Sequence, residues 1–190
     1  IDVVTFGLQL PDYSIGRTEN GWTLNHPTPN KSNSNAGLAD LKKLRINEFV
    51  AAAPPGGDDW IELYNMDEKP AALFGLSWEI GLGQFTYRRL SYLAPKSYKV
   101  FVADEKPGVR NLDFRLPADG GTILLRDQNG AEIDDVSYRT QTDGESRGRY
   151  PNGNGSWTTF TTTVSPGQAN YRPAIEGIQI NEILAINDAA

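Results

Sequence analysis

The stretch Asp59-Trp60-Ile61-Glu62-Leu63-Tyr64-Asn65 decides the fold. Its apolar and polar residues alternate, so Ile61 and Leu63 face one side and Glu62 faces the other. A period of two is typical of a β-strand that buries one face in a core. The alternation therefore predicts a strand over residues 60–65.

Short runs of the same kind occur along much of the chain, and no 3.6-residue period is sustained. They predict an all-β, immunoglobulin-like β-sandwich of about nine short strands. The strands are expected at residues 46–51, 60–65, 73–80, 86–90, 98–103, 112–115, 122–126, 133–138 and 157–162.

Two connections also have a sequence signal. Asp127-Gln128-Asn129-Gly130 lies between two apolar runs, and its Asn-Gly pair predicts a tight hairpin turn of the primed type. Residues 38–44 could form one or two helical turns, and we interpret them as part of a linker.

Several stretches repeat at a similar spacing. Ile1 to Phe6 resembles Ile133 to Tyr138, and Ser14 to Arg17 resembles Ser146 to Arg149. Further matches join Trp22 to Trp157, Pro29 to Pro166, and Leu44-Arg45-Ile46-Asn47-Glu48 to Ile178-Gln179-Ile180-Asn181-Glu182. A period of one domain indicates a tandem array. The expected parts are the rear of one repeat (1–37), a linker (38–45), a complete unit (46–171), a second linker (172–177) and the first strand of a further repeat (178–190).

The composition excludes several classes of site. The 190 residues include no Cys and one His, His26, so disulfides, thiolate zinc sites and iron–sulfur ligation are excluded. The net charge of −6 argues against a nucleic-acid partner, whose phosphates require cations. No apolar run is long enough to predict a membrane span.

The strand 59–65, preceded by Ile46-Asn47-Glu48, resembles the start of a lamin tail domain of the bacterial and archaeal type. The other motifs of that family follow in order. They are Phe74-Gly75-Leu76-Ser77-Trp78, Gly120-Gly121-Thr122-Ile123-Leu124-Leu125, Ser146-Arg147-Gly148-Arg149-Tyr150-Pro151-Asn152-Gly153, Trp157 and Ser165-Pro166-Gly167-Gln168-Ala169-Asn170. In the first fragment Asn30-Lys31 replaces Gly167-Gln168 and Glu19 replaces Pro151.

The resemblance implies an immunoglobulin-like sandwich. It further implies an extracellular or cell-surface accessory module, because similar prokaryotic domains recur in secreted and surface proteins, sometimes beside nucleases or CotH-like kinases. It supplies no catalytic residues, and no heptad rod typical of lamins is visible in the sequence.

Carboxylates at the start of the unit could hold a hard cation such as calcium. The candidate ligands are Asp58, Asp59 and Glu62, with Glu48 nearby. The alternative, which we favour, is a solvated strand face, because every second residue of such a strand faces water and no Asp-x-Asp-x-Asp-Gly ladder is present. No cofactor other than calcium is suggested.

Two further groups have a functional and a structural interpretation. Arg139, Arg147 and Arg149, with Arg17 in the first copy, could bind an anionic glycan or phosphate, or could pair with the protein's own carboxylates. The aromatic side chains could stack on a sugar or pack in the core; they are Trp60, Trp78, Trp157, Tyr64, Tyr87, Tyr92 and Phe101.

We therefore expect a non-enzymatic structural or adhesive module of a secreted or cell-surface repeat protein. Its partners would be neighbouring repeats or copies of the same protein, and cell-envelope polysaccharide is a further candidate. Head-to-tail assembly would use Ile178, Ile180 and Ile183 at one end, with Ile1 and Val3 at the other. The alternative is an accessory binding domain of a larger secreted enzyme such as a nuclease, hydrolase or CotH-like kinase.

Overall fold

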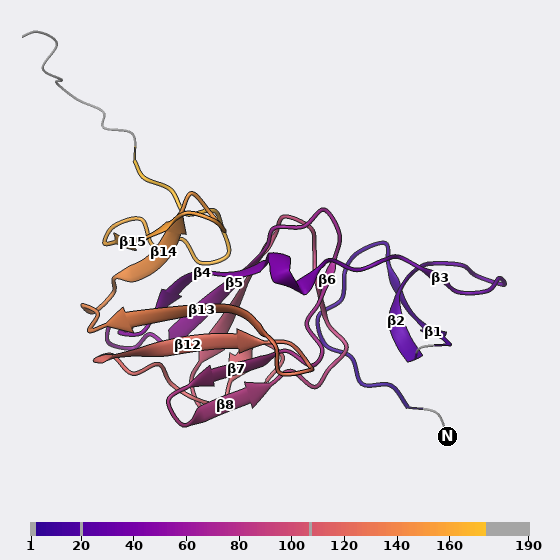
Figure 1. The fold of residues 1–190 in the computed structure, drawn as a ribbon, viewed down its shortest axis with the longest axis horizontal. Coiled ribbons are helices and arrows are strands. Elements are labelled where there is room, and N and C mark those ends of the chain that lie inside the picture. The colour runs from indigo at the N-terminus through magenta and orange to yellow at the C-terminus, as the bar shows by residue number, and fades with distance from the viewer. Residues whose placement is uncertain (1–2, 20, 107, 174–190) are drawn as a thin grey trace, which may run out of the picture.

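A computed structural model describes residues 3–19, 21–106 and 108–173 (Figure 1). Two sheets face each other across the core, with strand orders β11-β10-β5-β4-β14-β15 and β13-β12-β7-β8. Neighbouring strands are antiparallel except for β10 and β11, which are parallel. No α-helix occurs among these residues. The prediction of an all-β sandwich is confirmed.

The strands have the following bounds. The larger sheet contains β4 (Leu44–Val50), β5 (Asp59–Asn65), β10 (Tyr98–Ala103), β11 (Asn111–Leu112), β14 (Ser146–Tyr150) and β15 (Ser156–Phe160). The smaller sheet contains β7 (Ser77–Ile80), β8 (Gly83–Thr86), β12 (Gly120–Arg126) and β13 (Glu132–Arg139). Outside them lie β1 (Ser14–Thr18), β2 (Gly21–His26), β3 (Ser34–Asn35) and the short pair β6 (Ala71–Ala72) and β9 (Tyr92–Leu93).

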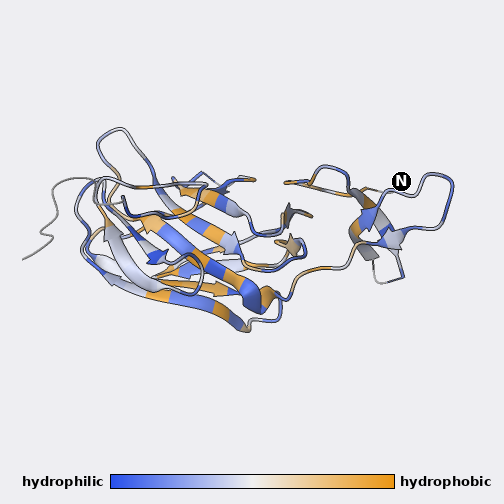
Figure 2. Cartoon of the chain, turned by 90° about the horizontal axis from the view of Figure 1, so that it is seen from above, coloured by the Kyte–Doolittle hydropathy of each residue, from blue (hydrophilic) through white to orange (hydrophobic). Residues whose placement is uncertain are grey.

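The core fills the space between the two sheets. Trp78 of β7 packs against Phe101 of β10, with ring centroids 5.7 Å apart, and Tyr87 meets the same Phe101 edge-on. Figure 2 shows hydrophobic and hydrophilic residues alternating along the strands. Alternation works here because each sheet has one face toward the other sheet and one face outward.

The predicted strands at 60–65, 98–103, 122–126, 133–138 and 157–162 are present, with ends shifted by a few residues at most. Strand β4 likewise matches the prediction for 46–51. The sequence patterns missed β14, whose Ser-Arg-Gly-Arg-Tyr composition has no hydrophobic alternation.

Three predicted strands were wrong in part. Residues 73–76 form a turn instead of the first half of a strand, because Gly75 has a φ of +83° and Leu76 N bonds Leu73 O. Strand β8 ends at Thr86, so residues 87–90 continue as an irregular segment. Only Asn111–Leu112 of the region around 112–115 is a strand.

The hairpin between β12 and β13 is confirmed, but its primed turn is not. Gly130 has a φ of +81°, whereas Asn129 does not have positive φ. The turn is closed by a bond from Gly130 N to Asp127 O, and the Asp127 carboxylate accepts from the N–H groups of Asn129 and Ala131. These bonds favour a longer loop with a bulge over a two-residue connection.

The stretch expected to be a helical linker contains a single 3-10 turn, Leu41–Lys43. Asp40 caps it, because its side chain accepts from Lys42 N. Strand β4 follows immediately at Leu44. The linker therefore contributes the first residues of the sandwich.

The N-terminal strands β1, β2 and β3 form a small separate sheet beside one end of the sandwich (Figures 1 and 2). A strap of residues 5–8 precedes it and runs along residues 90–92 of the sandwich. The strap is held by bonds from Gly7 N to Leu90 O, Leu90 N to Thr5 O and Tyr92 N to Leu8 O. Leu8 N also donates to Ser91 Oγ at 3.0 Å.

The domain boundaries expected from the repeat stay a prediction. Of the residues expected to join copies, Val3 is exposed, with 76% of its surface accessible. Ile1, Ile178, Ile180 and Ile183 lie outside the described residues. Within the described part of the chain, no helix is both long and apolar enough to cross a bilayer.

Candidate functional site

The most unusual feature of the sandwich is a β-bulge in β4. The pairing of β4 with β5 shifts register between Ile46 and Glu48, which leaves Asn47 as the extra residue. Leu44 and Ile46 lie in the core before the bulge, and Phe49 and Ala51 lie in it afterwards. Because the bulge changes the phase of the strand by one residue, consecutive Asn47 and Glu48 both avoid the core.

Asn47 and Glu48 therefore lie on the outer face of the larger sheet, where Glu48 is the direct cross-strand partner of Glu62 on β5. Such a face would ordinarily meet water, yet all three side chains have no accessible surface. They are covered by the closing segment, which we define as residues 161–170. Two adjacent carboxylates are thus buried on the outside of a sheet.

Each carboxylate is surrounded by hydrogen-bond donors. Glu48 accepts from the hydroxyls of Ser146 and Ser165 and from Ser165 N. Glu62 accepts from Asn47 Nδ2 at 2.9 Å and from Gly167 N at 2.6 Å. Buried carboxylates need such partners because an unpaired one is far more costly to desolvate.

Two asparagines complete the contact between β4 and the closing segment. Asn170 Nδ2 donates to Asn47 O at 3.2 Å and to Arg149 O at 3.0 Å, so it joins β4 to β14. The side-chain carbonyl of Asn152 accepts from Asn47 Nδ2 and Asn170 N. We call Asn47, Glu48, Glu62, Ser146, Asn152, Ser165 and Asn170 the closing network.

Burial raises the pKa of Glu62 to about 8, while the bonds from Asn47 and Gly167 act in the opposite direction and the neighbouring Glu48 raises it further. Burial also raises the pKa of Glu48, against the effect of its serine donors. Burial of two carboxyl groups on directly paired residues favours retention of a proton, because it disfavours two negative charges side by side.

The opposite face of the same bulge ties the two sheets together. Asp134 of β13 accepts from Ile46 N at 2.8 Å and forms an ion pair with Arg149 of β14 at 3.0 Å. Arg149 donates in turn to Ile46 O and lies over the ring of Trp157, 4.6 Å from its centroid. These bonds satisfy the backbone groups of Ile46 that the bulge removes from the strand ladder.

The structure does not bring the three predicted calcium ligands together. Asp58 is exposed, and Asp59 points to the face opposite Glu62, where it accepts from Ala53 N. Glu62 itself is inside the closing network, so the expectation of a solvated Glu62 was wrong: the closing segment covers it. The described residues contain no group of three acidic or histidine side chains placed to hold a metal.

The predicted arginine strip is divided between different environments. Arg149 is engaged by Asp134, while Arg139 and Arg147 line a shallow hollow of about 520 Å³ beside Tyr138. Arg17 lies over Trp22 in the N-terminal sheet, 4.9 Å from the ring centroid. These guanidinium groups do not form one continuous surface.

Most of the predicted aromatic platform is core. Trp78, Phe101, Tyr87 and Tyr92 are buried, and Trp157 packs against the core beneath Arg149. Trp60 and Tyr64 are half-buried on the outer face of β5. Tyr64 is stacked on Tyr98 at 4.4 Å, so one face of each of these rings is already occupied.

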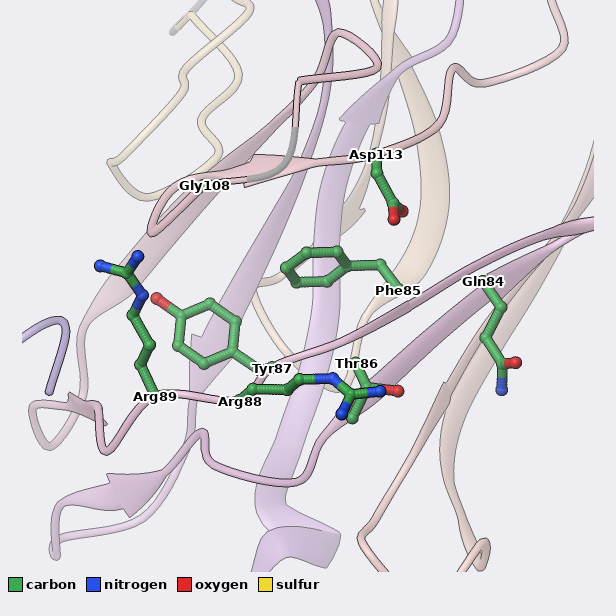
Figure 3. A pocket seen from close by; sticks show the side chains of 8 residues that line it. All are labelled: Gln84, Phe85, Thr86, Tyr87, Arg88, Arg89, Gly108 and Asp113. Carbon is green, nitrogen blue, oxygen red and sulfur yellow. The ribbon is translucent and has the colours of Figure 1, made fainter. Parts of the chain in front are cut away.

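A second candidate site is a half-open pocket of about 380 Å³ beside β8, lined by Gln84, Phe85, Thr86, Tyr87, Arg88, Arg89, Gly108 and Asp113 (Figure 3). The two guanidinium groups point apart, and the rings of Phe85 and Tyr87 lie between Arg89 and Asp113 (Figure 3). Among the described residues, neither Arg88 nor Arg89 forms an ion pair or hydrogen bond. The pocket therefore offers two exposed cationic groups and the half-buried ring of Phe85, while Tyr87 is buried in the core.

Gly148 tests how tightly the closing network is packed. A Cβ at this position would lie 2.4 Å from Asn170 Nδ2 and 3.0 Å from Phe160. We expect Gly148→Ala to lower the free energy of unfolding by about 1 to 3 kcal/mol, the usual cost of overpacking. Gly121→Ala is the matched strand control, because its Cβ would have no neighbour closer than 3.6 Å. Urea unfolding of both variants measures the difference, and equal losses would contradict the packing argument.

Glu62 predicts a specific pH dependence. Its folded pKa of about 8 lies above the ordinary 4.5, so between these values the folded protein keeps a proton that the unfolded chain has lost. Its contribution to stability is therefore complete below pH 4.5 and is lost as the pH rises toward 8. The Tm of the wild type, relative to that of Glu62→Gln, should fall across this range.

The slope of Tm with pH is the readout for Glu62. A glutamine can accept only one of the two bonds from Asn47 and Gly167, because its amide nitrogen cannot accept, and that loss is the same at every pH. Glu132→Gln removes an exposed carboxylate and serves as the control. A constant Tm difference between Glu62→Gln and the wild type from pH 5 to 8 would contradict the raised pKa.

The sandwich and the motifs within residues 39–140 agree with a comparison to protein-family models. The lamin tail domain model matches residues 39–140, which is more than half of the chain. A comparison with curated proteins finds no match. The matched region starts just before the bulged strand and ends after β13, so the closing segment lies beyond it. The chain belongs to the lamin tail domain family.

Proposed function

We propose that this lamin tail domain chain is a non-enzymatic structural module of a secreted or cell-surface protein, which holds neighbouring units in a fixed arrangement. The observation that carries the proposal is the closing network. Its carboxylates, hydroxyls and amides are the most concentrated polar chemistry in the described residues, and they contact each other instead of solvent. They join the first strand of the sandwich to its last segment.

The connection between the N-terminal sheet and the sandwich supports the same role. The chain enters this sheet from the strap on residues 90–92 and leaves it at Ala39, whose N–H bonds Pro70 O at 2.8 Å. Both connections are therefore fixed to the same end of the sandwich. A module anchored at its entry and its exit transmits orientation, as a structural spacer requires.

A distance measurement tests this rigidity. The chain has no cysteine, so Ser32→Cys in the loop before β3 and Glu132→Cys on β13 provide two exposed spin-label sites without background. We expect a single narrow distance distribution by pulsed electron paramagnetic resonance. A broad distribution would overturn the role as a rigid spacer.

Gly7 supplies the matched perturbation for that experiment. A Cβ here would lie 2.4 Å from Ser91 Oγ, the atom that accepts from Leu8 N, so Gly7→Ala should loosen the strap and broaden the distribution. Gly121→Ala, whose Cβ has no contact closer than 3.6 Å, should leave the distribution unchanged.

A second candidate function is that of an accessory binding domain for an anionic envelope polysaccharide. It is favoured by the pocket beside β8, where two exposed arginines that form no ion pair among the described residues lie near the half-buried ring of Phe85, in a protein of net charge −6. Guanidinium groups bind sulfate or carboxylate through paired hydrogen bonds, and aromatic rings can stack on sugars.

Dextran sulfate and neutral dextran are suitable probes for this second function. Calorimetry should detect salt-dependent binding of dextran sulfate that Arg88→Ala/Arg89→Ala weakens by about tenfold or more. Arg115→Ala/Arg126→Ala is the control, because it also removes two positive charges, from arginines that already pair with Glu105 and Glu79. Equal loss in both variants would show that only net charge matters.

A further inference from the structure

The N-terminal hairpin β1–β2 reproduces the geometry of the closing hairpin β14–β15. In the first hairpin Arg17 pairs with Trp22, and in the second Arg149 pairs with Trp157. Each arginine lies over its tryptophan, at 4.9 Å in the first hairpin and 4.6 Å in the second. The strands thus share both register and side-chain contacts.

The segments that follow the two hairpins also correspond. Lys31 N bonds Thr28 O and Gln168 N bonds Ser165 O, each at 3.1 Å. The intervening residues Asn30 and Gly167 both have positive φ, at 62° and 81°. Asn30 is therefore the counterpart of the glycine that donates to Glu62 in the closing network.

The third correspondence is an asparagine. Asn33 Nδ2 donates to Arg17 O at 2.8 Å, as Asn170 Nδ2 donates to Arg149 O at 3.0 Å. Asn170 makes a second bond, to the backbone of Asn47 on β4. Among the described residues, Asn33 Nδ2 has no such second acceptor.

The difference between the hairpins is the neighbouring strand. β14 lies between β15 and β4, with Gly148 opposite Glu48 and Arg147 opposite Phe49. β1 is an edge strand of its sheet and pairs with β2 alone among the described elements. The edge of β1 is thus the position that β4 occupies beside β14.

A buried polar atom lies next to this edge. Asn25 has no accessible surface, and its amide nitrogen donates to Gly16 O at 3.2 Å on β1. Its Oδ1 is buried and has no hydrogen-bond partner among the described residues. Such an atom calls for a donor, and an added strand would bring backbone N–H groups to this side of the hairpin.

The sequence contains a segment that matches β4. Residues Ile178-Gln179-Ile180-Asn181-Glu182 match Leu44-Arg45-Ile46-Asn47-Glu48, the strand that fills this position beside β14. We propose that the edge of β1 binds residues 178–183 of a second copy of this chain. Asn33 would then donate to the Asn181 backbone, and the Thr28 hydroxyl would face Glu182 as Ser165 faces Glu48.

This interface deepens the proposed structural function and rests on it. The contact is heterologous, with the front of one chain meeting the rear of the next, so successive copies would form a linear series. Transferring the register of β4 and β14 places Ile15 opposite Ile183 and Gly16 opposite Glu182.

Site-directed disulfide formation tests the interface and its register. One full-length chain carries Ile15→Cys and is labelled with ¹⁵N, and an unlabelled full-length chain carries Ile183→Cys. After oxidation, intact mass spectrometry should show the mixed dimer as the main product. Leu184→Cys is the register control, because the side chain of residue 184 would point to the other face of an added strand. Its yield of mixed dimer should be at least about fivefold lower than that of Ile183→Cys.

A synthetic peptide of residues 176–190 should compete for the edge of β1 and so lower the yield of the mixed dimer. Circular dichroism should confirm that the variants are folded. Equal yields for the Ile183→Cys and Leu184→Cys variants, or a predominance of dimers between identical chains, would overturn the interface. The spin-label distances of the single chain are independent of this result. A narrow distance distribution without the mixed dimer would refute the interface alone and leave the spacer function in place.

Discussion

The bulge at Asn47 is the constraint on which the rest of the structure depends. By adding one residue to β4, it places Asn47 and Glu48 together on the outer face of the sheet and returns Phe49 to the core. Ile46 loses strand partners at the same point and is served by Asp134 and Arg149 from the other side. The bulge therefore requires two polar clusters, the closing network on one face of the strand and the Asp134–Arg149 pair on the other.

Burying Glu48 and Glu62 side by side is costly, and hydrogen-bond donors from the closing network and from Gly167 offset much of that cost. Ser146 and Ser165 serve Glu48, while Asn47 and Gly167 serve Glu62. Because most of these donors lie far along the chain from β4, the network forms only when the sandwich is complete. The buried polar groups of the first strand, β4, therefore need the closing segment to be in place. Such a dependence suits a module that must keep a fixed shape.

The two hairpins show how the same local sequence behaves with and without its neighbouring strand. Both keep the arginine over the tryptophan and the asparagine on the arginine carbonyl. These contacts are internal to the hairpin and its following turn. The bonds to a bulged strand, by contrast, are seen only at β14, where β4 is present.

The sequence by itself determined the all-β class, most strand positions and the family motifs, because alternation and turn residues report local geometry. It did not reveal β14, the bulge or the burial of Glu62: a strand pattern shows which residues share a face, but not what covers that face. Residues 161–170, about a hundred residues along the chain, cover that face, so the burial of Glu62 depends on the tertiary structure. The same reason explains why Asp59 and Glu62, close in sequence, are divided between opposite faces.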